Sequence, residues 1–118
     1  MKLRLRENSI RLRVNRQELN RLASGKGLKE SVVFPGNTKL SYLLAPASQP
    51  EPIVLFDGSG IRVSVPSRTV KQWADSQDIG IYLDFPAGDA LLKVAIEKDL
   101  ECLHGPEEER DPDAFPRN

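Results

Sequence analysis

The first fourteen residues alternate basic and apolar side chains along two short segments. In an extended chain, alternate residues point to the same face, so this spacing puts the basic residues together on one side of a strand pair. Guanidinium and ammonium groups in that arrangement can neutralise phosphates of a nucleic acid, and each contact makes binding more sensitive to salt. The candidate contact residues are Lys2, Arg4, Arg6, Arg11 and Arg13, with Asn8 in the turn between the segments. A solvated sheet face without a ligand is the alternative interpretation.

Charge is divided unevenly along the chain, although the formal net charge is zero. Residues 1–50 contain ten Lys or Arg against three Glu, a balance of +7, so the remaining residues carry −7. Five of the carboxylates lie in 105–118, an acidic tail whose composition is typical of disordered segments. We expect this tail to lie across the basic residues and mask them, or to mimic a partner. A tail that only aids solubility is the alternative.

Metal or nucleophilic chemistry would have to come from Cys102 and His104, which stand beside several carboxylates. A closed zinc site needs about four ligands, whereas the chain has only this one Cys and this one His. A Cys and a His separated by a single residue also lack the geometry of a catalytic pair. The glycine turns at 25–27 and 58–60 match neither the phosphate-loop nor the dinucleotide-binding pattern. We therefore expect no metal, no cofactor and no catalytic residue.

A shift of 51 positions aligns residues 2–45 with residues 53–96 without a gap, and the apolar positions then coincide as a set. The identical pairs include Ile10 with Ile61, Arg11 with Arg62, Ala23 with Ala74, Phe34 with Phe85 and Pro35 with Pro86. This constant register predicts a tandem duplication joined by a Pro-, Ala- and Ser-rich linker. The alternative is that two units of the same supersecondary type merely share a similar apolar pattern.

Each repeat has the periodicity of two strands, a short helix and two further strands. The expected strands are 2–6, 10–14, 30–34, 39–44, 53–56, 61–65, 79–84 and 90–96. Asn15 followed by Glu18 predicts a reciprocally capped start for the first helix. Ser67 is expected to cap the second helix, with Val70 and Trp73 on its buried side.

The expected fold class is α+β, because strands and helices alternate within each unit. One unit of about 45 residues buries too little surface to be stable alone, so two units related by a pseudo-twofold axis should share one core. We expect one swapped-hairpin-like β barrel with two short helices. The single domain would span 1–104, with 97–104 as a closing segment, and the acidic tail would follow.

The segment Asn8-Ser9-Ile10-Arg11-Leu12-Arg13-Val14-Asn15, followed by a helix and two strands, resembles the swapped-hairpin DNA-binding domains of the AbrB, MazE and MraZ type. Ser59-Gly60-Ile61-Arg62-Val63-Ser64-Val65-Pro66 is similar to the same signature. The resemblance implies DNA binding, usually as a homodimer, with Arg13 at a phosphate- or base-contacting position. Asn15 stands where the signature has proline, and Ser64 stands where it has arginine.

The whole chain also resembles a group of short, uncharacterised bacterial proteins. The shared features are the basic hairpin, Glu97-Lys98-Asp99 with Cys102-Leu103, and the terminal segment Asp111-Pro112-Asp113-Ala114-Phe115-Pro116. That resemblance implies no activity. A duplicated β assembly is similar as well to the triphosphate-tunnel (CYTH) enzymes, but those need several acidic residues alternating along strands as metal ligands, whereas most acidic residues here fall in turns and the tail.

No apolar stretch typical of a secretory signal follows the N-terminus, and no run is long enough to span a bilayer, so we expect a cytoplasmic protein. The leading hypothesis is a non-enzymatic bacterial binding module, monomeric or homodimeric, that binds DNA or another polyanion. A protein-interaction module with a self-masking tail is the second hypothesis. A CYTH-like polyphosphate-binding enzyme is the third.

Overall fold

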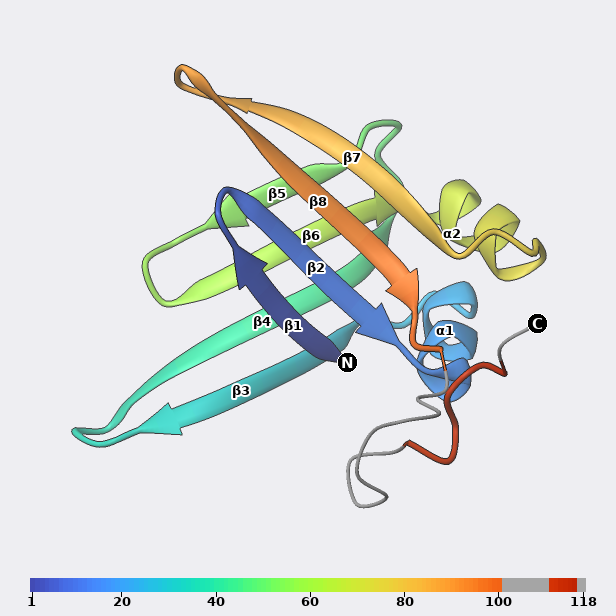
Figure 1. Ribbon diagram of the computed structural model, residues 1–118, viewed down its shortest axis with the longest axis horizontal. Coiled ribbons are helices and arrows are strands. Elements are labelled where there is room, and N and C mark those ends of the chain that lie inside the picture. Colours follow the sequence, from blue (N-terminus) through green and yellow to red (C-terminus); the bar gives the residue numbers. More distant parts are fainter. Residues whose placement is uncertain (101–110, 117–118) are drawn as a thin grey trace. The chain divides into compact units, whose positions relative to one another are not determined.

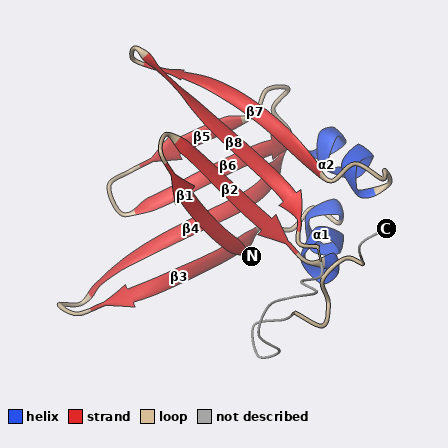
Figure 2. Cartoon of the chain, viewed as in Figure 1, coloured by secondary structure: helices blue, strands red, loops and turns tan. Residues whose placement is uncertain are grey.

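The structure is a computed structural model that describes residues 1–100 and 111–116. Its elements are β1 (Lys2–Arg6), β2 (Ser9–Val14), α1 (Arg16–Ala23), β3 (Leu28–Phe34), β4 (Thr38–Ala47), β5 (Ile53–Phe56), β6 (Gly60–Pro66), α2 (Ser67–Ala74), β7 (Gly80–Ala87) and β8 (Ala90–Lys98) (Figure 1). The described residues thus form eight strands and two short helices (Figure 2), which confirms the α+β class. The chain divides into two compact units, Met1–Leu19 with Gln77–Asn118, and Asn20–Ser76.

The first unit contains a four-stranded sheet in the order β1-β2-β8-β7. Two antiparallel hairpins, β1-β2 and β7-β8, are joined by parallel pairing between β2 and β8, which lie side by side in Figure 1. One face of this sheet is apolar because the side chains alternate along each strand. Its buried members are Ile10, Leu12 and Val14 of β2, and Val94 and Ile96 of β8.

The second unit contains the other sheet, in the order β3-β4-β6-β5. Here too the two hairpins are antiparallel and the central pair, β4 with β6, is parallel. The buried residues of this sheet are Leu28, Leu44, Val63 and Val65. Val70 and Trp73 of α2 are buried as well, which confirms the predicted buried side of that helix.

The two helices begin in different ways. At α1, the Asn15 backbone N–H donates to Glu18 Oε1 and the Glu18 backbone N–H donates to Asn15 Oδ1, each over 2.9 Å, so the predicted reciprocal cap is confirmed. The prediction that Ser67 caps α2 is wrong. Pro66 is the N-cap of α2 and makes no side-chain cap bond, and the Ser67 hydroxyl lies near the Ala47 carbonyl of β4, 3.2 Å away.

The expected closed barrel is also wrong, because the described strands form two four-stranded sheets. The element order β-β-α-β-β does occur twice, but the gapless register does not hold. Leu12 pairs with Ile96, and Val63 pairs with Leu44, so the offset is 51 between Leu12 and Val63 and 52 between Leu44 and Ile96. The duplication therefore stays a prediction.

The two later hairpins also differ in their turns, and the residues that flank those turns are offset by 53 before the turn and 52 after it. Phe34 pairs with Thr38 across a three-residue turn, whereas Ala87 pairs with Ala90 across a two-residue turn. The aligned Phe85 and Pro86 consequently lie inside β7 rather than at a turn. Proline is tolerated there because β7 is an edge strand, where a missing ladder donor costs little.

Residues 111–116 of the predicted acidic tail lie against the start of α1 and the end of β8. The Asp113 carbonyl accepts a 3.1 Å hydrogen bond from the Arg16 N–H, and Asp113 Oδ2 accepts one of 2.8 Å from the Gln17 N–H. Phe115 N–H donates to the Asp99 carbonyl over 2.7 Å, and Phe115 forms a parallel bridge with Leu100. The remaining tail residues, and the expectations for Cys102 and His104, lie outside the described residues.

This docking is expected to depend on pH through Asp111. The Asn15 side chain and the Asp113 backbone N–H donate to the Asp111 carboxylate, and these bonds hold the pKa of Asp111 below its usual value of 3.8. A lowered pKa stabilises the docked form above the usual pKa, and that contribution is lost as the pH falls through the lowered value.

NMR signals of the Asn15 side-chain amide and the Asp113 amide should therefore stay constant from neutral pH down to about 4 and change below it. In Asp111→Asn this acid transition should disappear. A transition centred above the usual carboxylate pKa would contradict the contact.

Among the described residues, no helix is long and apolar enough to cross a membrane.

Candidate nucleic-acid interface

Strand pairing brings the predicted basic residues together on one face of the sheet β1-β2-β8-β7. Residues that pair directly across strands point to the same side of a sheet. Three rows of paired residues cross the centre of this face: Lys2, Arg13 and Glu97; Arg4, Arg11 and Ala95; Arg6, Ser9 and Lys93. We call the six cations Lys2, Arg4, Arg6, Arg11, Arg13 and Lys93 the basic face. Two carboxylates share it, those of Glu97 and Asp84.

The cations of the basic face differ in exposure and in ion pairing, and therefore in how available they are to a ligand. Arg4 and Arg6 are exposed on the edge strand β1 and form no ion pair with a described residue. Arg11 and Arg13 are half-buried on β2, with side chains 40% and 42% exposed. Lys2 is committed to a structural contact, because its Nζ lies 2.7 Å from Oδ2 of the buried Asp99.

Asn8 is not part of this face. It lies in the turn between β1 and β2, and its side-chain Nδ2 donates to the Leu91 carbonyl over 3.0 Å. The adjacent Ser9 hydroxyl donates to the Arg6 carbonyl over 2.6 Å. These bonds fix the hairpin turn, so Asn8 positions the basic strands instead of extending their cationic surface.

Glu97 on β8 organises the two half-buried arginines. Its Oε1 lies 3.2 Å from Arg11 Nε and 3.8 Å from Arg13 Nε, and its Oε2 accepts a 2.8 Å hydrogen bond from the Tyr82 hydroxyl. One carboxylate can neutralise at most one of two guanidinium groups, each of which carries five N–H donors. Arg11 and Arg13 therefore keep donors and net positive charge for an anion.

Gly80 leaves room for the Tyr82 phenol to reach Glu97. A Cβ at Gly80 would come within 2.7 Å of the Ile96 carbonyl and 3.1 Å of the Tyr82 hydroxyl, so only glycine lets the phenol reach Glu97 along this path. The hydrogen bond to Glu97 raises the pKa of Tyr82 above 10.0, and partial burial and the Glu97 charge add to that effect. Tyr82 accordingly remains a protonated donor at neutral pH.

Two hollows open on the basic face where small side chains separate large ones. The larger, about 370 Å³, lies around Ala95, between Arg11 on β2 and Tyr82 on β7, and Lys93 also lines it. The smaller, about 260 Å³, is lined by Arg11, Arg13, Tyr82 and Glu97. Phosphate oxygens can accept hydrogen bonds from the Arg11 guanidinium in both hollows, from the Lys93 ammonium in the larger and from Arg13 in the smaller.

The sequence did not point to Lys93, Tyr82 or Glu97 as part of this face. They lie more than sixty residues from β1 and β2 and reach the basic strands only through the parallel pairing of β2 with β8. The signal available was local: Lys93, Ala95 and Glu97 alternate with buried Val94 and Ile96. That pattern identifies a polar face but not its neighbour.

The described part of the acidic tail does not lie on the arginines of the basic face. The carboxylates of Asp111 and Asp113 contact Asn15, Arg16 and Gln17, at the start of α1. Glu107, Glu108 and Glu109 are outside the described residues, so masking of the basic face stays a prediction. Within residues 1–100 and 111–116, no group of three or more His, Cys, Asp or Glu side chains could hold a metal ion.

Comparisons with known proteins identify a family but not an activity. No curated protein and no solved structure matches the chain. The AbrB-like resemblance therefore stays a prediction. A model of a family of unknown function, DUF7009, matches residues 1–118. The full-length match agrees with the expected membership of a short uncharacterised family. The chain belongs to this DUF7009 family.

Proposed function

We propose that this protein binds the phosphate backbone of duplex DNA on the basic face of the sheet β1-β2-β8-β7. The proposal is supported by one observation above the others. Six cations lie on a single sheet face; Lys2 is paired with Asp99, and the other five share the face with two carboxylates, Glu97 and Asp84. A surface of that kind gains affinity by releasing counterions from the DNA. It has no requirement for a particular base sequence.

The distribution of free cations supports backbone contacts more than base reading. Arg4 and Arg6 are exposed on an edge strand, where the long side chains can follow a phosphate row. The Glu97 carboxylate lies beside the guanidinium groups of Arg11 and Arg13 and orients them. A guanidinium group held in this way can donate two parallel hydrogen bonds to one phosphate. Tyr82 is the aromatic residue beside them, and its hydroxyl is engaged with Glu97. Affinity should therefore differ little between DNA sequences.

Neutralising the two exposed cations of β1 tests the proposal. In Arg4→Gln/Arg6→Gln, the logarithmic salt slope of DNA binding should become shallower by about 1.8, because each lost phosphate contact removes about 0.9. Fluorescence anisotropy with a labelled duplex of arbitrary sequence measures this slope. Neither side chain is buried, so the fold should be retained.

The matched control removes the same charge elsewhere. Arg21→Gln/Arg68→Gln changes two exposed helix residues, one on each helix. This variant should keep the wild-type salt slope. Equal losses in both double variants would show that only net charge matters and would contradict a defined binding face. An unchanged slope in Arg4→Gln/Arg6→Gln would contradict it as well.

A further inference from the structure

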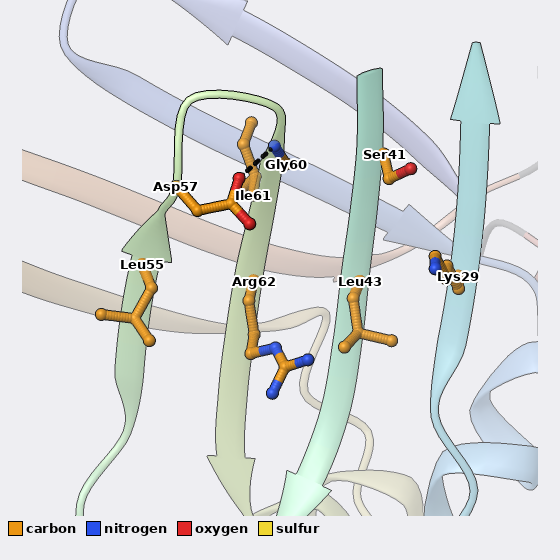
Figure 3. Close-up of a pocket in the computed structure, with 8 residues that line it drawn as sticks. All are labelled: Lys29, Ser41, Leu43, Leu55, Asp57, Gly60, Ile61 and Arg62. Carbon is orange, nitrogen blue, oxygen red and sulfur yellow. Dashed lines mark hydrogen bonds between the residues drawn. The ribbon is translucent and has the colours of Figure 1, made fainter. Parts of the chain in front are cut away.

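A second hollow lies on the other sheet, within the unit Asn20–Ser76. Lys29 of β3 pairs with Leu43 of β4, Leu43 pairs with Arg62 of β6, and Arg62 pairs with Leu55 of β5. These four side chains therefore form one row across the sheet, as Figure 3 shows on four adjacent strands. With Ser41, Asp57, Gly60 and Ile61 they line a cavity of about 420 Å³. That volume lies at the lower end of the range for small-molecule pockets, about 300–1,000 Å³.

Small residues make this hollow. Ser41 pairs with Gly60 in the next row of the same face, so two small residues follow the large ones. A Cβ at Gly60 would lie 3.2 Å from the Ser41 carbonyl oxygen, so a larger residue at position 60 would be crowded against the backbone of β4. The Ser41 hydroxyl is 2.8 Å from the Ser31 hydroxyl of β3, and this pair offers further donors beside Lys29.

The cations of this pocket lack a partner within the described residues. Neither Lys29 nor Arg62 forms an ion pair there. Asp57, the one acidic residue of the lining, is committed to its own turn. Its Oδ1 accepts from the Ser59 N–H, the Ser59 hydroxyl and the Gly60 N–H at 2.9, 3.1 and 2.7 Å, as the dashed line to Gly60 in Figure 3 illustrates.

The order of side chains along the row defines the ligand chemistry. Neighbouring strands lie about 4.8 Å apart, so Lys29 and Arg62 start about 10 Å from each other on either side of Leu43. Both side chains are long enough to converge above Leu43 on one anionic group. Leu55 is 58% exposed on the edge strand β5, on the far side of Arg62, and supplies an apolar surface there.

We propose that this pocket binds a small molecule that joins one anionic head group, a carboxylate or a phosphate, to a short apolar chain. Arg62 and Lys29 bind the head group, and Leu43 and Leu55 contact the chain. This site is independent of the DNA-binding proposal, because it lies on the other sheet and shares no residue with the basic face.

Titration of the full chain with four matched probes tests the proposal. Hexanoate and hexyl phosphate carry the two head groups on the same chain, hexylamine reverses the charge, and inorganic phosphate lacks the chain. At least one of the first two should bind saturably and shift the backbone amide signals of Leu43, Gly60 and Arg62. The stronger of the two identifies the head group. Hexylamine should leave these signals unchanged, and inorganic phosphate should bind more weakly.

Substitutions locate the binding. Arg62→Gln and Lys29→Gln should each weaken the preferred probe about tenfold, since each removes a charged hydrogen-bond donor. Arg68→Gln, an exposed arginine outside the pocket, should leave the affinity unchanged. Equal binding of hexylamine, shifts confined to Arg11, Tyr82 and Ala95, or full affinity in Arg62→Gln would overturn the assignment. None of these outcomes would contradict DNA binding by the other sheet.

Discussion

Replacing Trp73 with alanine is expected to lower the free energy of unfolding by about 3–5 kcal/mol, the cost typical of a large aromatic truncation in a core. Trp73 is 4% exposed on α2, one turn after the buried Val70. Removing the indole takes away its burial and leaves a cavity that the surrounding structure fills only in part. Since a total stability of about 5–15 kcal/mol is usual, this single change would use a large part of it.

Urea unfolding followed by far-UV circular dichroism measures that loss. Indole fluorescence would not serve, because Trp73 is the only tryptophan of the chain and the variant lacks it. Lys71→Ala, an exposed position on the same helix, is the matched control and should change stability by less than about 0.5 kcal/mol. A loss below about 1 kcal/mol in Trp73→Ala would show that the tryptophan does not pack in the core.

Local patterns were the part of the fold that the sequence could predict. The alternation of Arg4 and Arg6 with Leu3 and Leu5 correctly predicted a hairpin strand, because a two-residue period fixes which side chains share a face. The Asn15 and Glu18 cap was predictable for a similar reason. Its two hydrogen bonds join residues three positions apart and need no distant partner.

Interactions between distant segments were not predictable in the same way. Ser67 has the residue type of a helix cap, but in the structure its hydroxyl is directed to the Ala47 carbonyl, twenty positions earlier. The parallel pairings of β2 with β8 and of β4 with β6 divide the strands into two sheets, and no local pattern encodes them. A barrel was expected because the alternation of polar and apolar residues is the same in either arrangement.

In the candidate site, too, local patterns predicted some residues, and pairing between distant segments added the others. The arginines of β1 and β2 were predicted to share a face, whereas Lys93, Tyr82 and Glu97 join that face only through β8 and β7. Asn8 was included for its place in a motif, and the structure gives it a bond to the Leu91 carbonyl at the other hairpin. The pocket around Arg62 escaped prediction because its cations lie on β3 and β6, more than thirty residues apart.

Salt sensitivity of DNA binding is the second large expected effect. Lys2 is tied to Asp99, so Arg4, Arg6, Arg11, Arg13 and Lys93 are the cations available for phosphates. Five contacts predict a logarithmic slope of about −4.5, so raising the salt concentration from about 50 to about 200 mM should lower the affinity roughly 500-fold. Binding through nonpolar contacts alone would give a far smaller change, because such contacts release no counterions.

The most direct test of the DNA-binding account is therefore the affinity of the full chain for a duplex of arbitrary sequence, measured across that salt range. The account predicts saturable binding at low salt, a slope between about −3.5 and −4.5, and the same slope for a second, unrelated duplex. The lower limit allows for one arginine retained by Glu97. No saturable binding at the lowest salt, or a slope shallower than about −1, would contradict the assignment of the basic face to DNA.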